Sequence, residues 1–139
     1  MNQQKGFSLI EIMIVVVILG ILASIVVPKM MGRPDEARKV KAKQDVLSIQ
    51  NALDLYKLDN GTYPSTDQGL LALVEKPSSN PLPMNWKQYL KSLPKDPWGR
   101  EYLYLNPGQH TDVDVFTQGA DGQPGGTGIN AEIGNWDDQ

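Results

Sequence analysis

FSLIEIMIVVVILGILASIVV, at positions 7–27, is the stretch of sequence that decides the fold. It holds 21 residues and one charge, on Glu11. An α-helix rises about 1.5 Å per residue, so this stretch spans roughly 31 Å, the hydrocarbon thickness of a bilayer. An isolated membrane span must pair its backbone polar groups internally, so we expect a transmembrane helix.

The remainder of the chain, residues 28–139, is long enough for one small domain. The net charge of −3 gives no indication of a nucleic-acid partner. The absence of cysteine excludes a disulfide framework, a zinc–thiolate site and a cysteine nucleophile. The single histidine, His110, leaves no histidine pair for a metal.

The position of the polar leader, residues 1–6, raises the question of where the precursor is cut. A secretory signal peptide is cut after its apolar region, and Ala23–Ser24 is a possible place for this. In the second alternative the cut follows Gly6, and the apolar helix stays in the mature protein. A third alternative is an uncleaved signal anchor.

The segment KGFSLIEIMIVVVILGILASIVVP, positions 5–28, resembles the start of type IV pilin-like precursors. This resemblance implies that a prepilin peptidase cuts between Gly6 and Phe7 and methylates the new amino group of Phe7. Glu11 then matches the glutamate at the fifth mature position of the family. The implied role of Glu11 is to pair with the amino terminus of a neighbouring subunit. The alternative is a carboxylate that is simply hydrated at the level of the lipid headgroups.

A second helical segment, residues 29–60, follows the membrane segment, residues 7–28. Its apolar residues step by four, three, four and three positions, which predicts one face of an amphipathic helix: Ala42, Val46, Ile49, Leu53 and Tyr56. Asp59–Asn60–Gly61 is a typical helix stop. We expect one long helix, with a bend or local melting between Gly20 and Pro34 as the alternative.

A basic cluster lies at the start of this segment: Lys29, Arg33, Arg38, Lys39, Lys41 and Lys43. The simplest interpretation is a solvated helix face. Contact with lipid headgroups is an alternative. Pairing with Asp35, Glu36 or Asp45 of neighbouring subunits is another.

Residues 61–139 are predicted to form the globular part. The expected elements are a short helix opened by a capping box at 65–68 and running to about 74, a short strand at 89–90, a turn at 96–99, and strands at 102–105 and 113–117. The fold class is therefore α+β, with a long N-terminal helix packed on a small antiparallel sheet.

Five further segments narrow the resemblance: LDLYKLDNGTYPST, LPKDPWG, YLYLNPGQH, GADG and IGNW. They are similar to the major pseudopilins of type II secretion systems. Subunits of true type IV pili share the N-terminus but usually carry a C-terminal cysteine pair, which is absent here.

The resemblance implies a structural subunit that is anchored by a single span in the bacterial inner membrane, with its C-terminal part in the periplasm. Copies polymerise into a short periplasmic pseudopilus that drives export of folded proteins across the outer membrane. The implied partners are further copies of the chain, minor pseudopilins, the inner-membrane assembly platform, prepilin peptidase and membrane lipid.

The C-terminal loop, residues 118–136, is rich in glycine. Its composition alone favours a flexible acidic tail held by Trp136. The resemblance instead implies a structural calcium ion. The implied ligands are Gln118, Asp121, Gln123, Asn130 and Glu132, with the two glutamines giving backbone carbonyls. Asn130 and Glu132 stand where homologues commonly have aspartates, so we expect a lower affinity than usual.

The sequence does not favour an enzyme. Ser65, Asp67 and His110 can be combined into a triad, but nothing around them resembles a nucleophile elbow. The remaining alternative to a filament subunit is a monomeric, membrane-anchored periplasmic binding module.

Overall fold

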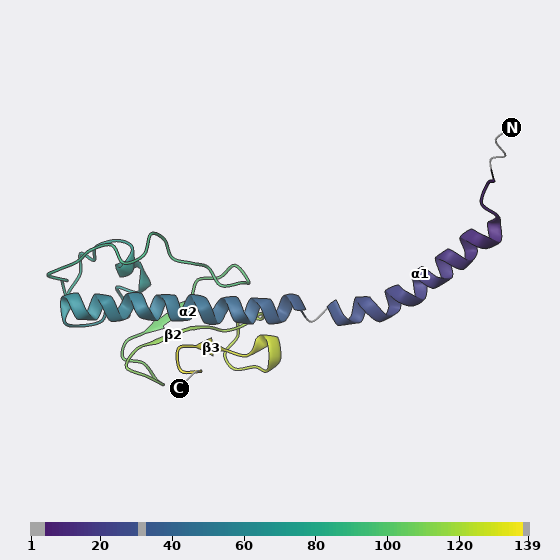
Figure 1. Cartoon of the computed structure of the whole chain (residues 1–139). Helices are drawn as coiled ribbons and strands as arrows, with labels where there is room; N and C mark the ends of the chain where they lie inside the picture. Colours follow the sequence, from purple (N-terminus) through teal and green to yellow (C-terminus); the bar gives the residue numbers. More distant parts are fainter. Residues whose placement is uncertain (1–4, 31–32, 138–139) are drawn as a thin grey trace. The chain divides into compact units, whose positions relative to one another are not determined.

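The computed structural model describes residues 5–30 and 33–137. Two long helices, α1 and α2, precede two short 3-10 segments and three short strands (Figure 1). The contacts within the chain divide it into two compact units, Met1–Glu36 and Ala37–Gln139.

Helix α1, Leu9–Met30, confirms the helix predicted from the apolar stretch. It continues through Gly20 and includes Pro28. Its apolar side chains are exposed on every face. The helix is long and apolar enough to cross a membrane. Of the predicted bend region, Met31 and Gly32 lie outside the described residues.

Helix α2, Arg33–Asn60, carries the predicted amphipathic face. All five predicted positions are buried, and Ala52 joins them. The helix ends as its stop signal predicts: Gly61 has φ of 84°, and its N–H donates to the Lys57 carbonyl at 2.7 Å. Glycine adopts this left-handed conformation without the steric penalty that a Cβ brings.

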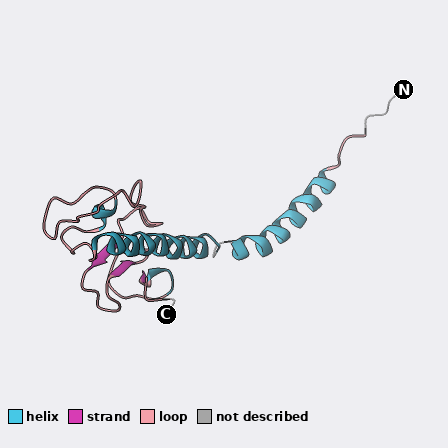
Figure 2. Cartoon of the chain, turned by 60° about the vertical axis from the view of Figure 1, so that its left-hand side comes forward, coloured by secondary structure: helices cyan, strands magenta, loops and turns pink. Residues whose placement is uncertain are grey.

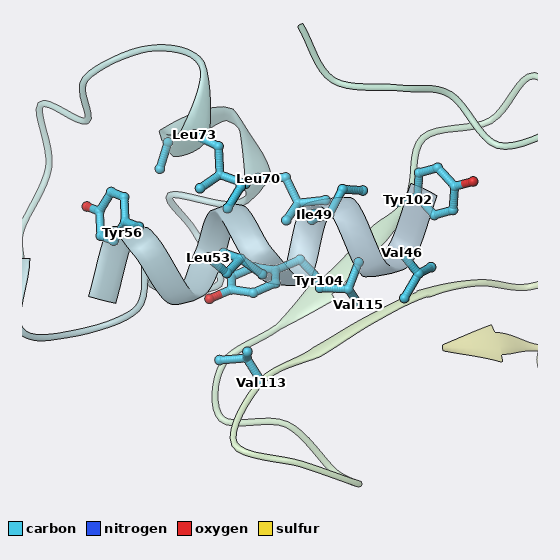
Figure 3. Packing of buried hydrophobic residues seen from close by; sticks show 12 residues of the cluster. Val46, Ile49, Leu53, Tyr56, Leu70, Leu73, Tyr102, Tyr104, Val113 and Val115 are labelled. Carbon is cyan, nitrogen blue, oxygen red and sulfur yellow. The ribbon is translucent and has the colours of Figure 1, made fainter. Parts of the chain in front are cut away.

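In the second unit, α2 lies between two layers that pack against its opposite sides (Figures 1 and 2). The 3-10 segment η1, Leu70–Leu73, lies on one side of the helix and the sheet on the other. Figure 3 shows Leu70 and Leu73 above the helix, and Tyr104, Val113 and Val115 below it. The helix buries Ile49 and Leu53 completely between these layers.

The sheet has the order β1-β2-β3 and is antiparallel. Strands β1, Leu103–Leu105, and β2, Asp114–Thr117, confirm the two predicted strands within one residue at their starts. Tyr104 pairs with Val115, and both face the core. The α+β class is therefore confirmed.

Strand β3, Ile133–Gly134, was not predicted from the sequence. It pairs with Phe116 and Thr117 of β2. Two residues, one of them glycine, are too few to produce an alternating pattern. The Trp136 ring packs directly against Gly134 and occupies the space that a Cβ there would need, which explains the glycine at this position.

The strand predicted at Tyr89–Leu90 is wrong. The backbone N–H groups of both residues donate to the Leu73 carbonyl, at 2.9 and 3.0 Å. Their backbone hydrogen bonds thus go to the end of η1 and not to a neighbouring strand. The Tyr89 ring packs at 5.4 Å from the ring of Tyr56, so burial against α2 places this segment.

The predicted capping box is confirmed, although the helix it opens is shorter than expected. Ser65 N–H donates to Gln68 Oε1 at 3.0 Å, and Gln68 N–H donates to Ser65 Oγ at 3.1 Å. The segment that follows contains four residues of 3-10 helix. The turn at 96–99 is also confirmed, since Gly99 N–H donates to the Asp96 carbonyl at 3.0 Å.

Candidate assembly helix and metal-binding loop

The predicted cleavage site precedes α1. Gly6 and Phe7 have no regular secondary structure, and the Phe7 side chain is 85% exposed. The helix begins two residues later, at Leu9. A peptidase would therefore meet an exposed, non-helical peptide bond at this position.

Glu11 forms a second capping box that sequence reasoning missed. Ser8 N–H donates to Glu11 Oε2 at 3.1 Å, and Glu11 N–H donates to Ser8 Oγ at 3.3 Å. The signal was present in the sequence, since Ser8 and Glu11 have the S-x-x-E spacing of this motif. In a single chain, the Glu11 carboxylate thus stabilises the start of its own helix while remaining exposed.

The glycine-rich loop closes on itself. The N–H of Ala120 donates to the Ile129 carbonyl at 3.0 Å. A Cβ on Gly119 would lie 2.7 Å from the Asn130 carbonyl carbon, and one on Gly126 would collide with the Asn130 oxygen. The two arms of the loop are therefore in direct backbone contact, and this approach requires glycine. The composition alone predicted a flexible acidic tail held by Trp136; the structure instead shows a loop whose two arms contact each other through backbone atoms.

The predicted metal ligands lie in this loop with the following contacts. Asp121 Oδ1 accepts from the Gln123 N–H at 3.1 Å, and Glu132 Oε1 accepts from the Gly125 N–H at 3.3 Å. The Asn130 backbone packs against Gly126. Gln118 directly follows β2, where the loop begins.

The donor set suits a hard cation. Every predicted ligand offers oxygen, which is what calcium binds, and calcium tolerates irregular geometry. Within the described part of the chain, however, no three acidic or histidine side chains gather as a metal cluster. A cation here would need amide and carbonyl oxygens beside the carboxylates of Asp121 and Glu132.

The far end of the loop is anchored by Trp136, as the composition suggested. Its ring stacks on His110 with centroids 3.9 Å apart and packs at 5.5 Å from Phe116 of β2. His110 Nδ1 lies 3.0 Å from Asp114 Oδ2. The histidine considered for a triad thus contacts a structural carboxylate, while Ser65 belongs to its capping box.

Asp114 is a buried hydrogen-bond acceptor for several backbone N–H groups, and sequence reasoning missed it. Its side chain is 1% exposed. It accepts backbone hydrogen bonds from Gln109, His110 and Thr111 at 2.7 to 3.3 Å. Burial alone would raise the pKa of this carboxyl group, but the hydrogen bonds from Thr111, His110 and Gln109 outweigh it and lower the pKa. Asp114 thereby fixes the loop between β1 and β2.

Lys41 of the basic cluster forms an ion pair within the chain. Lys41 Nζ lies 2.5 Å from Asp45 Oδ2, one helical turn away. The same carboxylate oxygen accepts from the Tyr102 hydroxyl at 2.8 Å. Asp45 thus joins α2 to the strand side of the unit and is already engaged in the single chain.

Comparison with known proteins matches these features to one family. The family described as "Type II secretion system (T2SS), protein G" matches residues 29–136. A "Prokaryotic N-terminal methylation motif" matches residues 1–27. The chain belongs to the protein G family of type II secretion systems. Together, the two matches cover the apolar helix, the stem helix and the glycine-rich loop.

Relatives of known identity agree along nearly their whole length. The type II secretion system core protein G of Vibrio cholerae serotype O1 is 58% identical, with 100% of this chain and 96% of the relative covered. That of Pseudomonas aeruginosa is 59% identical, with 98% and 97% covered.

A solved structure agrees as well. The crystal structure of the major pseudopilin from the type 2 secretion system of enterohaemorrhagic Escherichia coli has 49% sequence identity and a TM-score of 0.68. The match covers 80% of this chain and 96% of that one. These findings confirm the predicted major-pseudopilin family and its role as a pseudopilus subunit. The relatives are structural subunits and not enzymes, and the binding-module alternative is set aside.

Proposed function

We propose that the chain is cut between Gly6 and Phe7, that Phe7 is N-methylated, and that copies then polymerise from the inner membrane into a periplasmic pseudopilus. The match of residues 1–27 to the methylation motif supports the processing. The observation that carries the assembly is the apolar surface of α1, exposed on every face. Such a surface needs lipid or other copies of the helix around it.

Assembly moves α1 from lipid into a shared helical core. This transfer is close to neutral in hydrophobic free energy, because lipid tails are about as apolar as leucine. Specific contacts must therefore set direction and register. We propose that Glu11 supplies one of them, by pairing with the positive amino terminus of Phe7 on a neighbouring copy.

The remaining partners follow from this scheme. Minor pseudopilins and an inner-membrane assembly platform would start and drive the filament, and prepilin peptidase would process each precursor. A single inner-membrane span, with the C-terminal part of the chain in the periplasm, fits the length of α1.

The mature N-terminus provides the test of processing. Intact-mass and peptide mass spectrometry of chain expressed with a prepilin peptidase should show Phe7 as the first residue, with one added methyl group. A retained Met1, or a chain that begins at Ser24, would contradict the proposal.

We also propose that the loop at 118–132 holds a structural calcium ion. Asp121 and Glu132 would supply charge, while Asn130 and the carbonyls of Gln118 and Gln123 would complete an oxygen shell. When bound, the ion would neutralise the two carboxylates and link the arms of the loop. Five glycines with positive φ support this proposal, because such a loop is costly to order without added contacts: Gly119, Gly122, Gly125, Gly126 and Gly128.

Calcium is accordingly expected to raise the melting temperature of the full chain in detergent. An ion that binds only the folded state at 100 times its Kd adds about 2.7 kcal/mol, which corresponds to roughly 10 °C for a unit of this size. The measurement is a thermal melt followed by tryptophan fluorescence, in calcium and in chelator. All three tryptophans lie in the second unit, so the signal reports on that unit alone.

The controls are magnesium at the same concentration and the Asp121→Asn variant. Magnesium requires near-ideal octahedral geometry and should give a much smaller shift. Asp121→Asn should weaken the calcium response. Equal melting temperatures in calcium and chelator would remove the calcium site and leave the filament role intact.

A further inference from the structure

Arg100 extends its side chain into the glycine-rich loop. Its Nη2 donates to the carbonyls of Gly119 and Ala120, at 2.5 and 3.0 Å. These two residues lie just before Asp121, the central carboxylate of the proposed metal site. The guanidinium thus places a permanent positive charge against the backbone of this loop.

Because Gly122 has no side chain, its backbone leaves room for this guanidinium. A Cβ on Gly122 would lie 2.8 Å from Arg100 Cζ and 2.9 Å from Nε. Gly122 also has φ of 64°, a conformation that residues with a Cβ rarely adopt. The loop backbone therefore packs directly on the planar group, and this contact requires glycine.

The backbone of Arg100 is held by a buried carboxylate. Asp96 is 5% exposed, and its Oδ1 accepts from the Arg100 N–H at 2.8 Å. Its Oδ2 accepts from Thr117 Oγ1 at 2.6 Å, at the end of β2 where the loop begins. Asp96 thus connects the turn that carries Arg100 to the strand that leads into the loop.

We propose that Arg100 is a built-in cation that holds residues 119–122 in their folded conformation when no metal is bound. A guanidinium has five donors in a rigid plane and always carries its charge, so it can satisfy adjacent carbonyls while packing on backbone. Arg100 is a positioning residue: it orders the arm that presents Asp121. We call the contact of the Arg100 guanidinium with residues 119–122 the Arg100 clamp. The part of this inference that concerns metal rests on the proposed calcium site, and the clamp itself does not.

The first test is hydrogen exchange of the loop in the full chain in detergent, with chelator present. Arg100→Ala should speed exchange in a peptide covering residues 119–131 by roughly tenfold, because two charge-assisted hydrogen bonds are lost. Lys95→Ala is the matched control. Lys95 is exposed and lines a surface pocket together with Arg100. Its substitution removes one positive charge near the loop and should leave loop exchange unchanged.

The second test is a double-mutant cycle that combines Arg100→Ala with Gly122→Ala. The alanine Cβ at position 122 would displace the Arg100 guanidinium from the loop backbone. Alone, this variant suffers both the collision with Arg100 and the unfavourable φ. In the Arg100→Ala background only the φ penalty remains, so the combined loss of stability in chelator should be clearly smaller than the sum of the two single losses. Additive effects would show that the two groups are not in functional contact.

Calcium distinguishes the clamp from the metal site. If both proposals hold, calcium slows loop exchange in Arg100→Ala more than in the wild type, and the two chains become similar. If calcium protects neither chain but Arg100→Ala still speeds exchange in chelator, the clamp stands and the calcium site falls. Wild-type exchange rates in Arg100→Ala, with chelator, would overturn the clamp whatever calcium does.

Discussion

Glu11→Ala is expected to leave the chain inserted in the membrane and to reduce the yield of filaments at least about tenfold. Removing one partner of a buried charge pair typically costs about 3–5 kcal/mol, because the remaining charge is left unpaired. In the pairing that we propose, that remaining charge is the amino group of Phe7 on a neighbouring copy. The measurement is the amount of sheared filament relative to the total membrane-bound chain.

Two variants separate pairing from helix capping, since Glu11 also belongs to the capping box with Ser8. Glu11→Gln keeps an acceptor for the Ser8 N–H, because glutamine also serves at this position of the motif, but it removes the charge. It should assemble as poorly as Glu11→Ala. Ser8→Ala removes a cap worth about 1 kcal/mol and should have a much weaker effect. Normal filament yield from Glu11→Gln would leave Glu11 with a capping role only.

Asp114→Ala is expected to lower the free energy of unfolding of the second unit by roughly 2–4 kcal/mol. The substitution leaves the N–H groups of residues 109–111 without their acceptor, and each partly buried unpaired group costs about 1–3 kcal/mol before water reaches it. It also removes the partner of His110, which supports Trp136.

The measurement is urea unfolding of the full chain in detergent, followed by tryptophan fluorescence. Asp112→Ala is the control, since that side chain is exposed and two positions away. It should change stability by about 0.5 kcal/mol or less. Equal losses from the two variants would contradict the role assigned to Asp114.

The carboxyl group of Asp114 is also expected to make the stability of the second unit depend on pH. Its pKa is lowered in the folded chain, because the hydrogen bonds from Thr111, His110 and Gln109 outweigh burial. A lowered pKa adds stability above the unfolded value of about 3.9, and this stability is lost as pH falls through the folded value. The wild type should therefore lose stability below about pH 4 more steeply than Asp114→Asn. Parallel pH curves would show that the carboxylate is not the titrating group.

Periodicity explains why most of the fold could be predicted from the sequence. The buried face of α2 shows the spacing of a helix, and 102–105 and 113–117 have strand composition bounded by turn residues. Tyr89–Leu90 has similar composition, but its backbone is captured by Leu73, a residue 16 positions earlier whose proximity depends on tertiary packing.

The site could be predicted only in part, for a related reason. The capping box of Ser8 and Glu11 is local, and its spacing could have been recognised. Arg100 reaches carbonyls 19 and 20 residues away, and carbonyls carry no side-chain signature. Asp114 likewise serves amide groups of a loop whose path the sequence does not reveal. Contacts from a side chain to a distant backbone group therefore appear only in the structure.

The central claim is that α1 survives processing and becomes the shared core of many copies. Cryo-electron microscopy of the filaments formed on overproduction tests this most directly. We expect a central bundle of helices matching Leu9–Met30, with Glu11 of each copy beside the Phe7 amino group of a neighbour. Filaments whose centre lacks these helices, or overproduced chain that stays monomeric in the membrane, would contradict the account.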